Sequence, residues 1–136
     1  MNNVCEILKS AKTIAVVGIS DKPERDSYGI AKYLQQADYH VIGVNPLIKN
    51  VDDIIVYPKL TDIPFPVDIV DVFRRSDKIP ELVDDVIKIK PRVFWLQLGI
   101  FNNDAVDKIE SAGIDVIQNL CIKVEHRYCR AQKFSI

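Results

Sequence analysis

One loop of the sequence carries the residue types that bind a phosphate group. It spans residues 18–29 and opens with glycine, which lets the backbone come close to a ligand. The hydroxyls of Ser20 and Ser27 can donate hydrogen bonds, and the side chains of Lys22 and Arg25 carry positive charge. A helix that begins near Ser27 would also direct its free N–H groups toward an anion. The loop therefore predicts a phosphate site, and the alternative is a solvated loop with a capping serine.

The same loop departs from the dinucleotide-binding fingerprint. That fingerprint reads Gly-x-Gly-x-x-Gly and turns directly into a helix. Here Gly18 fills the first glycine position, but Ser20 fills the second, and Pro23 interrupts any immediate helix. The loop therefore does not predict the standard turn that binds NAD.

A neutral amide follows the second apolar run of the chain. Asn45 and Pro46 stand where NAD sites place an acidic residue that binds the ribose hydroxyls of adenosine. An amide can bond a hydroxyl without repelling a phosphate on the same ribose. The position therefore favours a nucleotide with a ribose phosphate, either coenzyme A or NADP. The alternative is that Asn45-Pro46 is only a turn.

An aromatic residue and two arginines follow the third apolar run. Arginines at the end of a strand can reach phosphates, and Phe73 could cover an adenine ring or a pantetheine arm. We expect either Arg74 or Arg75 to face the ligand, and their spacing does not distinguish them. The alternative is a solvated arginine beside a core phenylalanine.

Toward the C-terminus, several reactive residue types lie close together in the sequence. Cys121, Glu125 and His126 include a nucleophile, an orienting carboxylate and a base, but groups near in sequence need not meet in space. Cys121, His126 and Cys129 offer only three metal ligands and lack paired Cys-x-x-Cys spacing. We therefore expect neither a catalytic nor a metal site here, and a buried apolar role for Cys121.

Short apolar runs alternate with amphipathic segments along the chain. The runs are rich in β-branched residues and predict strands at residues 13–17, 39–44, 67–72, 92–97 and 114–117. The amphipathic segments predict helices near residues 4–10, 27–37, 79–90 and 102–112.

This alternation predicts an α/β, three-layer Rossmann-like fold. We expect a five-stranded parallel sheet of order 3-2-1-4-5 with helices on both faces, and a ligand at the carboxyl ends of the strands. Residues 49–66 contain three prolines and read as a long connection, which could include a short strand at residues 54–56.

The size and charge of the chain narrow the function classes. Its 136 residues suit one domain, spanning 1–136, and its net charge of −1 gives no general attraction to nucleic acid or to an anionic membrane. We find no apolar run long enough for a bilayer and no secretory signal pattern. Three cysteines at irregular spacing argue against a disulfide framework and for a reducing compartment, so we expect a cytoplasmic protein.

Taken together, these segments resemble a known family. The chain is similar to the small stand-alone CoA-binding domain proteins, close to the YccU-like group, and through them to the CoA-binding domain of the succinyl-CoA synthetase alpha subunit. The resemblance covers residues 12–126. It rests on six segments, namely residues 14–20 (IAVVGIS), 27–29 (SYG), 44–46 (VNP), 70–75 (VDVFRR), 95–99 (WLQLG) and 121–126 (CIKVEH).

The resemblance implies a site for coenzyme A or an acyl-CoA and no catalytic residue. A binding or regulatory module is therefore expected, with a small-molecule nucleotide as its ligand and no nucleic-acid, membrane or metal partner, and the identity of any protein partner is left open. The alternatives are a small NADP-dependent oxidoreductase and a nucleotide-sensing regulatory domain. The implied binding residues are Gly18, Ile19, Ser20, Lys22, Arg25, Ser27, Tyr28, Asn45, Pro46, Phe73, Arg74, Gln97 and Gly99.

Overall fold

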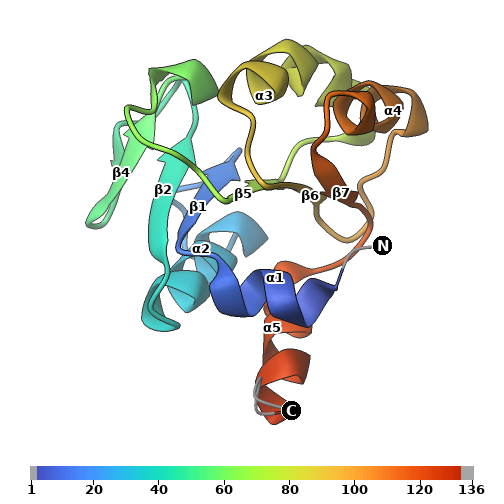
Figure 1. Cartoon of the computed structure of the whole chain (residues 1–136). Helices are drawn as coiled ribbons and strands as arrows, with labels where there is room; N and C mark the ends of the chain where they lie inside the picture. Colours follow the sequence, from blue (N-terminus) through green and yellow to red (C-terminus); the bar gives the residue numbers. More distant parts are fainter. Residues whose placement is uncertain (1–2, 133–136) are drawn as a thin grey trace.

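The fold is built on one seven-stranded sheet with helices on both faces (Figure 1). The computed structural model describes residues 3–132. The strands are β1 (Thr13–Val17), β2 (His40–Val44), β3 (Asn50–Val51), β4 (Ile54–Tyr57), β5 (Ile69–Val72), β6 (Val93–Leu96) and β7 (Asp115–Ile117). The helices are α1 (Val4–Ser10), α2 (Asp26–Gln36), α3 (Val83–Ile89), α4 (Asn103–Ser111) and α5 (Ile122–Ala131), with 3-10 helices η1 (Leu60–Asp62) and η2 (Ser76–Leu82).

The α/β class is confirmed, but the five-stranded parallel sheet of order 3-2-1-4-5 is wrong. The sheet runs β3-β4-β2-β1-β5-β6-β7, and β3 pairs with β4 in antiparallel fashion. The difference arises in the connection at residues 49–66, where β3 and β4 form a hairpin and β4 pairs with β2. Strand β4 thus takes the position beside β2 in which the third predicted strand was expected. That third predicted strand, β5, instead pairs with β1 on the side away from β2. When β3 is set aside, the parallel strands follow the doubly wound order 3-2-1-4-5-6.

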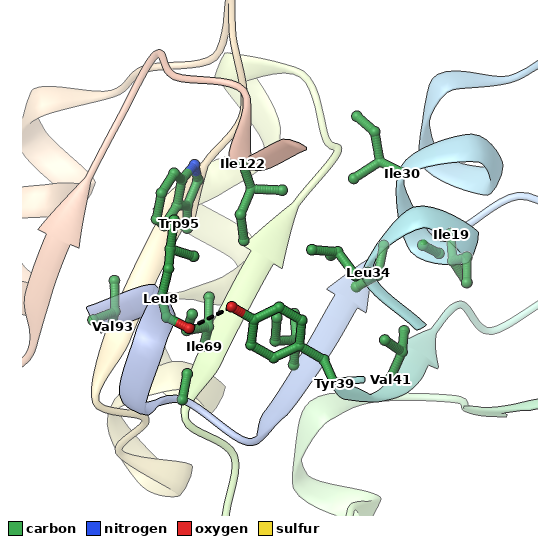
Figure 2. Close-up of a cluster of buried hydrophobic side chains, with 14 of the residues drawn as sticks. Leu8, Ile19, Ile30, Leu34, Tyr39, Val41, Ile69, Val93, Trp95 and Ile122 are labelled. Atoms are coloured by element: carbon green, nitrogen blue, oxygen red, sulfur yellow. Dashed lines mark hydrogen bonds between the residues drawn. The ribbon is translucent and has the colours of Figure 1, made fainter. Parts of the chain in front are cut away.

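Both faces of the sheet are covered, which explains why the strand sequences do not alternate with polar residues. Helices α1, α2 and α5 lie on one face, and α3 and α4 lie on the other (Figure 1). Trp95, Leu34 and Ile122 belong to the buried cluster on the first face (Figure 2). On the same face, the hydroxyl of Tyr39 donates a hydrogen bond to the carbonyl of Leu8, which joins the end of α1 to the start of β2 (Figure 2).

The last helix, α5, carries a feature that the sequence did not indicate. Cys129 of α5 forms a disulfide with Cys5 of α1, so the expectation of a chain without disulfides is wrong. The two cysteines are 124 positions apart and meet because α1 and α5 pack side by side on one face of the sheet. Spacing along a sequence cannot reveal such a contact. Helix α5 itself escaped prediction because it has little apolar periodicity, and only Ile122, His126 and Cys129 are buried.

No helix among residues 3–132 combines the length and the apolar character needed to cross a bilayer.

Candidate functional site

Three adjoining grooves lie at the carboxyl ends of the strands. The first, of about 830 Å³, runs between the start of α2 and the loops that follow β5, β6 and β7. The second, of about 580 Å³, lies between the first loop and residues 45–48. The third, of about 520 Å³, lies between residues 44–47, residues 58–60 and the start of α3. Phe73 lines all three, so the grooves meet at the end of β5.

A glycine fixes the centre of this arrangement. The backbone of Gly18 has a φ of +82°, which L side chains rarely adopt, and a Cβ there would lie 2.5 Å from the carbonyl oxygen of Phe73. Glycine therefore lets the turn after β1 lie directly against the loop after β5. The two loops that carry basic residues are brought together as a result.

The first loop is held by its own serines. Ser27 is buried, and its hydroxyl accepts a hydrogen bond from the backbone N–H of Ser20 at 3.0 Å. The hydroxyl of Ser20 accepts one from the N–H of Lys22 at 3.1 Å. Ser27 lies inside α2 and does not cap it, so the capping alternative is wrong. Arg25 is the N-cap residue, and no side chain of the described residues bonds the free N–H groups of the first turn.

The electrostatic character of the second groove is mixed. Lys22 and Arg25 line it together with Asp21, Glu24 and Asp26. A phosphate could bind there only beside Lys22 and Arg25, because the carboxylates, including that of Asp26 in the first turn of α2, would repel it.

The side chain of Asn45 links two loops through hydrogen bonds. Its Nδ2 donates to the carbonyl of Ile19 at 2.9 Å, and its Oδ1 accepts from the N–H of Leu47 at 2.9 Å. The second of these bonds confirms that Asn45 forms a turn. The same residue lines the second and third grooves, and Pro46 lines the third. A neutral side chain therefore borders the second and third grooves, whatever its role in the turn.

The two arginines differ in their surroundings. Arg74 lines the first and third grooves, its side chain is 35% exposed, and its Nη2 lies 3.3 Å from Glu81. Arg75 lines only the first groove, its side chain is 76% exposed, and its Nε lies 3.3 Å from Asp77. Arg74 is therefore the better placed of the two to contact a ligand that spans the grooves.

The loop after β6 forms the far wall of the first groove. Gln97 is buried, and its Oε1 accepts a hydrogen bond from the N–H of Ile122 at 3.0 Å, which ties the loop to the start of α5. Gly99 has a φ of +86°, and its N–H donates to Oδ1 of Asn119 at 2.7 Å. Both residues line the groove, as expected.

Tyr28 is the exception among the implied binding residues, because it lines none of these three grooves. Its hydroxyl donates to Asp52 at 2.6 Å, in the turn between β3 and β4. This hydrogen bond is the main reason that the pKa of Tyr28 is raised. Tyr28 therefore fastens α2 to the edge of the sheet and does not face a ligand in the grooves.

The reactive residues near the C-terminus do not form one site. Cys121 is partly exposed, free and in the wall of the first groove, so its expected burial is wrong. His126 is buried on the other side of α5, where its Nδ1 lies 2.7 Å from the hydroxyl of Tyr33. Burial, and then the charge of Arg130, lower the pKa of His126. Among residues 3–132, no three His, Cys, Asp or Glu side chains lie as a metal ion would require.

The sequence patterns did not indicate that Asp71 has an unusual environment. It lies in β5, two positions before Phe73, and is completely buried. Neither of its carboxyl oxygens has a hydrogen-bond partner among the described residues, and burial raises the pKa of this carboxyl well above its usual range. An aspartate within an otherwise apolar strand was the available signal.

Comparison of the sequence with known proteins finds a matching family model and a similar bacterial protein. A family model described as a CoA binding domain matches residues 12–127. The "Uncharacterized protein YneT" of Bacillus subtilis (strain 168) is 42% identical over 121 residues, which cover 89% of this chain and 90% of that protein.

Solved structures agree with this match. A hypothetical protein from Pyrococcus horikoshii OT3 has a TM-score of 0.90 and 37% identity, over 93% of this chain and 89% of that one. The dinucleotide forming acetyl-coenzyme A synthetase 1 of Ca. Korarchaeum cryptofilum, in its apo form, has a TM-score of 0.72 and 25% identity. That match covers 84% of this chain and only 28% of the synthetase.

Proposed function

The chain belongs to the CoA-binding domain family, and from that premise we propose that it binds coenzyme A in the three grooves without catalysing a reaction. The observation that carries the proposal is the junction at Phe73. There, two loops that carry basic side chains, Arg25 in one and Arg74 in the other, meet with the uncapped start of α2 beside the neutral amide of Asn45. This combination suits a nucleotide that carries phosphates both on its chain and on its ribose.

The three grooves differ in what they could hold. The third is bordered by Pro46, Pro58 and Leu47, which offer apolar faces for an adenine ring. Arg74 reaches both this groove and the first, and so could contact the phosphates between them. The pantetheine arm would then extend through the first groove over the ends of β5 and β6.

A binding role without catalysis is supported by the surroundings of the candidate reactive groups. Cys121 faces the groove, but His126, the histidine of the same segment, is turned into the core against Tyr33. General base catalysis would require the two groups within hydrogen-bond reach. We also propose that the protein acts in the cytoplasm, although the disulfide between Cys5 and Cys129 is uncommon in a reducing compartment.

Coenzyme A is expected to raise the melting temperature more than NAD or NADP does. A ligand at about 100 times its Kd adds roughly 2.7 kcal/mol to the free energy of unfolding, which is several degrees for a domain of this size. A thermal-shift assay with the three nucleotides at equal concentration measures this. A larger shift with NAD or NADP would reject the proposal in favour of an oxidoreductase-type site.

Glu81→Gln is expected to strengthen coenzyme A binding two- to fivefold. Glu81 lies 3.3 Å from Nη2 of Arg74 and lines the third groove, so its charge competes with a phosphate for that guanidinium. Exposed ion pairs contribute at most about 1 kcal/mol, which sets the size of the gain. Calorimetric titration gives the two Kd values.

The matched control is Asp77→Asn, which removes the partner of Arg75 at the same distance of 3.3 Å. Because Asp77 lines none of the three grooves, this variant should bind like the wild type. Equal gains in both variants would indicate a general charge effect and not competition at Arg74.

A further inference from the structure

The wall of the first groove changes character along the sheet. At the β1 and β5 side it holds Arg25, Arg74 and Arg75, together with the carboxylates of Glu24 and Asp26. In the order of the sheet, β6 and β7 come next, where the wall is formed by Leu98 and Ile100 and then by Cys121 and Lys123 at the start of α5. A ligand that follows the groove from β1 toward β7 therefore passes from a charged region, which holds the three arginines, to an apolar region at Leu98 and Ile100.

The apolar region is exposed to water in the structure. Leu98, which lines the groove, is 68% exposed, and Phe101, which follows the lining residues of this loop, is 55% exposed. Two hydrogen bonds to Asn119 hold the loop that carries them. The N–H of Gly99 donates to the side chain of Asn119, and the backbone N–H of Asn119 donates to the carbonyl of Ile100 at 3.2 Å. Apolar side chains held in place at the edge of a groove are typical of a surface that a ligand covers.

The groove also has room beyond a narrow arm. Its volume of about 830 Å³ lies toward the upper end of the range for small-molecule sites, which is about 300–1,000 Å³. No side chain with a charge lies between Gln97 and Ile100 in that wall. A free thiol at the end of a pantetheine arm would leave Leu98 exposed, whereas an acyl chain on the sulfur would cover it.

From this sequence of walls we propose that the ligand is an acyl-CoA, with a straight saturated acyl chain lying against Leu98 and Ile100. The inference rests on the proposed binding of coenzyme A and adds the class of its acyl group. It requires no reaction, because the thioester is bound and released intact. The arginines contact the phosphates, and the apolar region contacts the chain.

The test is a calorimetric titration with coenzyme A, acetyl-CoA, butyryl-CoA and octanoyl-CoA. A fully buried methylene adds about fourfold to affinity, and in an open groove we expect about twofold for each one. Octanoyl-CoA should therefore bind at least tenfold more tightly than acetyl-CoA. Equal affinity for all four ligands would overturn the acyl proposal and leave coenzyme A binding intact. Failure of all four to bind would overturn both proposals.

Two variants test where the acyl chain lies in the groove. Leu98→Ser should remove most of the dependence on chain length while changing the affinity for coenzyme A less than about twofold, since Leu98 would contact only the acyl group. Ile55→Ser is the control, because Ile55 is also an exposed aliphatic residue, 58% exposed, and lies in β4 outside the three grooves. It should bind all four ligands as the wild type does. A dependence on chain length that survives in Leu98→Ser would overturn the proposed position of the chain.

Discussion

Arg74→Ala is expected to weaken coenzyme A binding tenfold or more. Arg74 lines two of the three grooves, and its guanidinium is near the junction at Phe73 where the phosphates are proposed to bind. A charge-assisted hydrogen bond contributes on the order of 1.5–3 kcal/mol, which corresponds to about tenfold or more in Kd. Calorimetric titration of the wild type and the variant with coenzyme A provides the measurement.

Two controls separate this effect from a loss of folding or of general charge. The melting temperature should change little, because the ion pair between Arg74 and Glu81 is exposed and such pairs contribute about 1 kcal/mol at most. Lys108→Ala removes a positive charge from α4, away from the grooves, and should bind like the wild type. Arg25→Ala should lose affinity as Arg74→Ala does, because Arg25 lines the first and second grooves. Wild-type affinity in both arginine variants would show that the phosphates bind elsewhere.

Asp71→Asn is expected to remove a loss of stability that the wild type suffers as the pH rises. The buried carboxyl of Asp71 has no hydrogen-bond partner among the described residues, and burial raises its pKa well above the usual value. Between the unfolded pKa of about 3.9 and the raised folded pKa, the folded state binds more protons than the unfolded state. Its contribution to stability is therefore fully present below pH 4 and is lost as the pH rises through the folded pKa.

Urea unfolding at several pH values measures the effect. The free energy of unfolding of the wild type should fall, relative to that of Asp71→Asn, by up to about 1.4 kcal/mol per pH unit from pH 4 upward. The difference should level off once the pH passes the folded pKa. Asp115→Asn makes the same chemical change at an exposed position of β7 and should follow the wild type. A constant difference between wild type and Asp71→Asn would mean that Asp71 is not buried as an uncharged acid.

The sequence was most informative where a pattern is local. Apolar runs with β-branched residues predicted five of the strands, and the residue types that follow them predicted which loops gather at one edge of the sheet. Strand β4 was predicted only as an option within a long connection. A strand of four residues does not indicate from its sequence which other strand it will pair with. The position of β5 followed from that pairing, so one uncertain strand changed the whole order of the sheet.

Contacts between distant parts of the chain were beyond the sequence pattern. The meeting of Cys5 with Cys129 depends on how α1 and α5 pack. The resemblance implied that Tyr28 contacts the ligand, yet its hydroxyl bonds Asp52 in the turn between β3 and β4. The residues that line the grooves as expected include Asn45, Phe73 and Gln97, which directly follow the ends of β2, β5 and β6.

Native mass spectrometry of the full chain with equimolar coenzyme A and NADP tests the central proposal most directly. Both nucleotides carry a ribose phosphate, so the competition depends on the whole site and not on that one group. The account predicts one coenzyme A molecule on each chain, and the adduct should be strongly reduced in Arg74→Ala. A predominant NADP adduct would contradict the proposed function. So would a protein that shows no coenzyme A adduct even at a high concentration of coenzyme A.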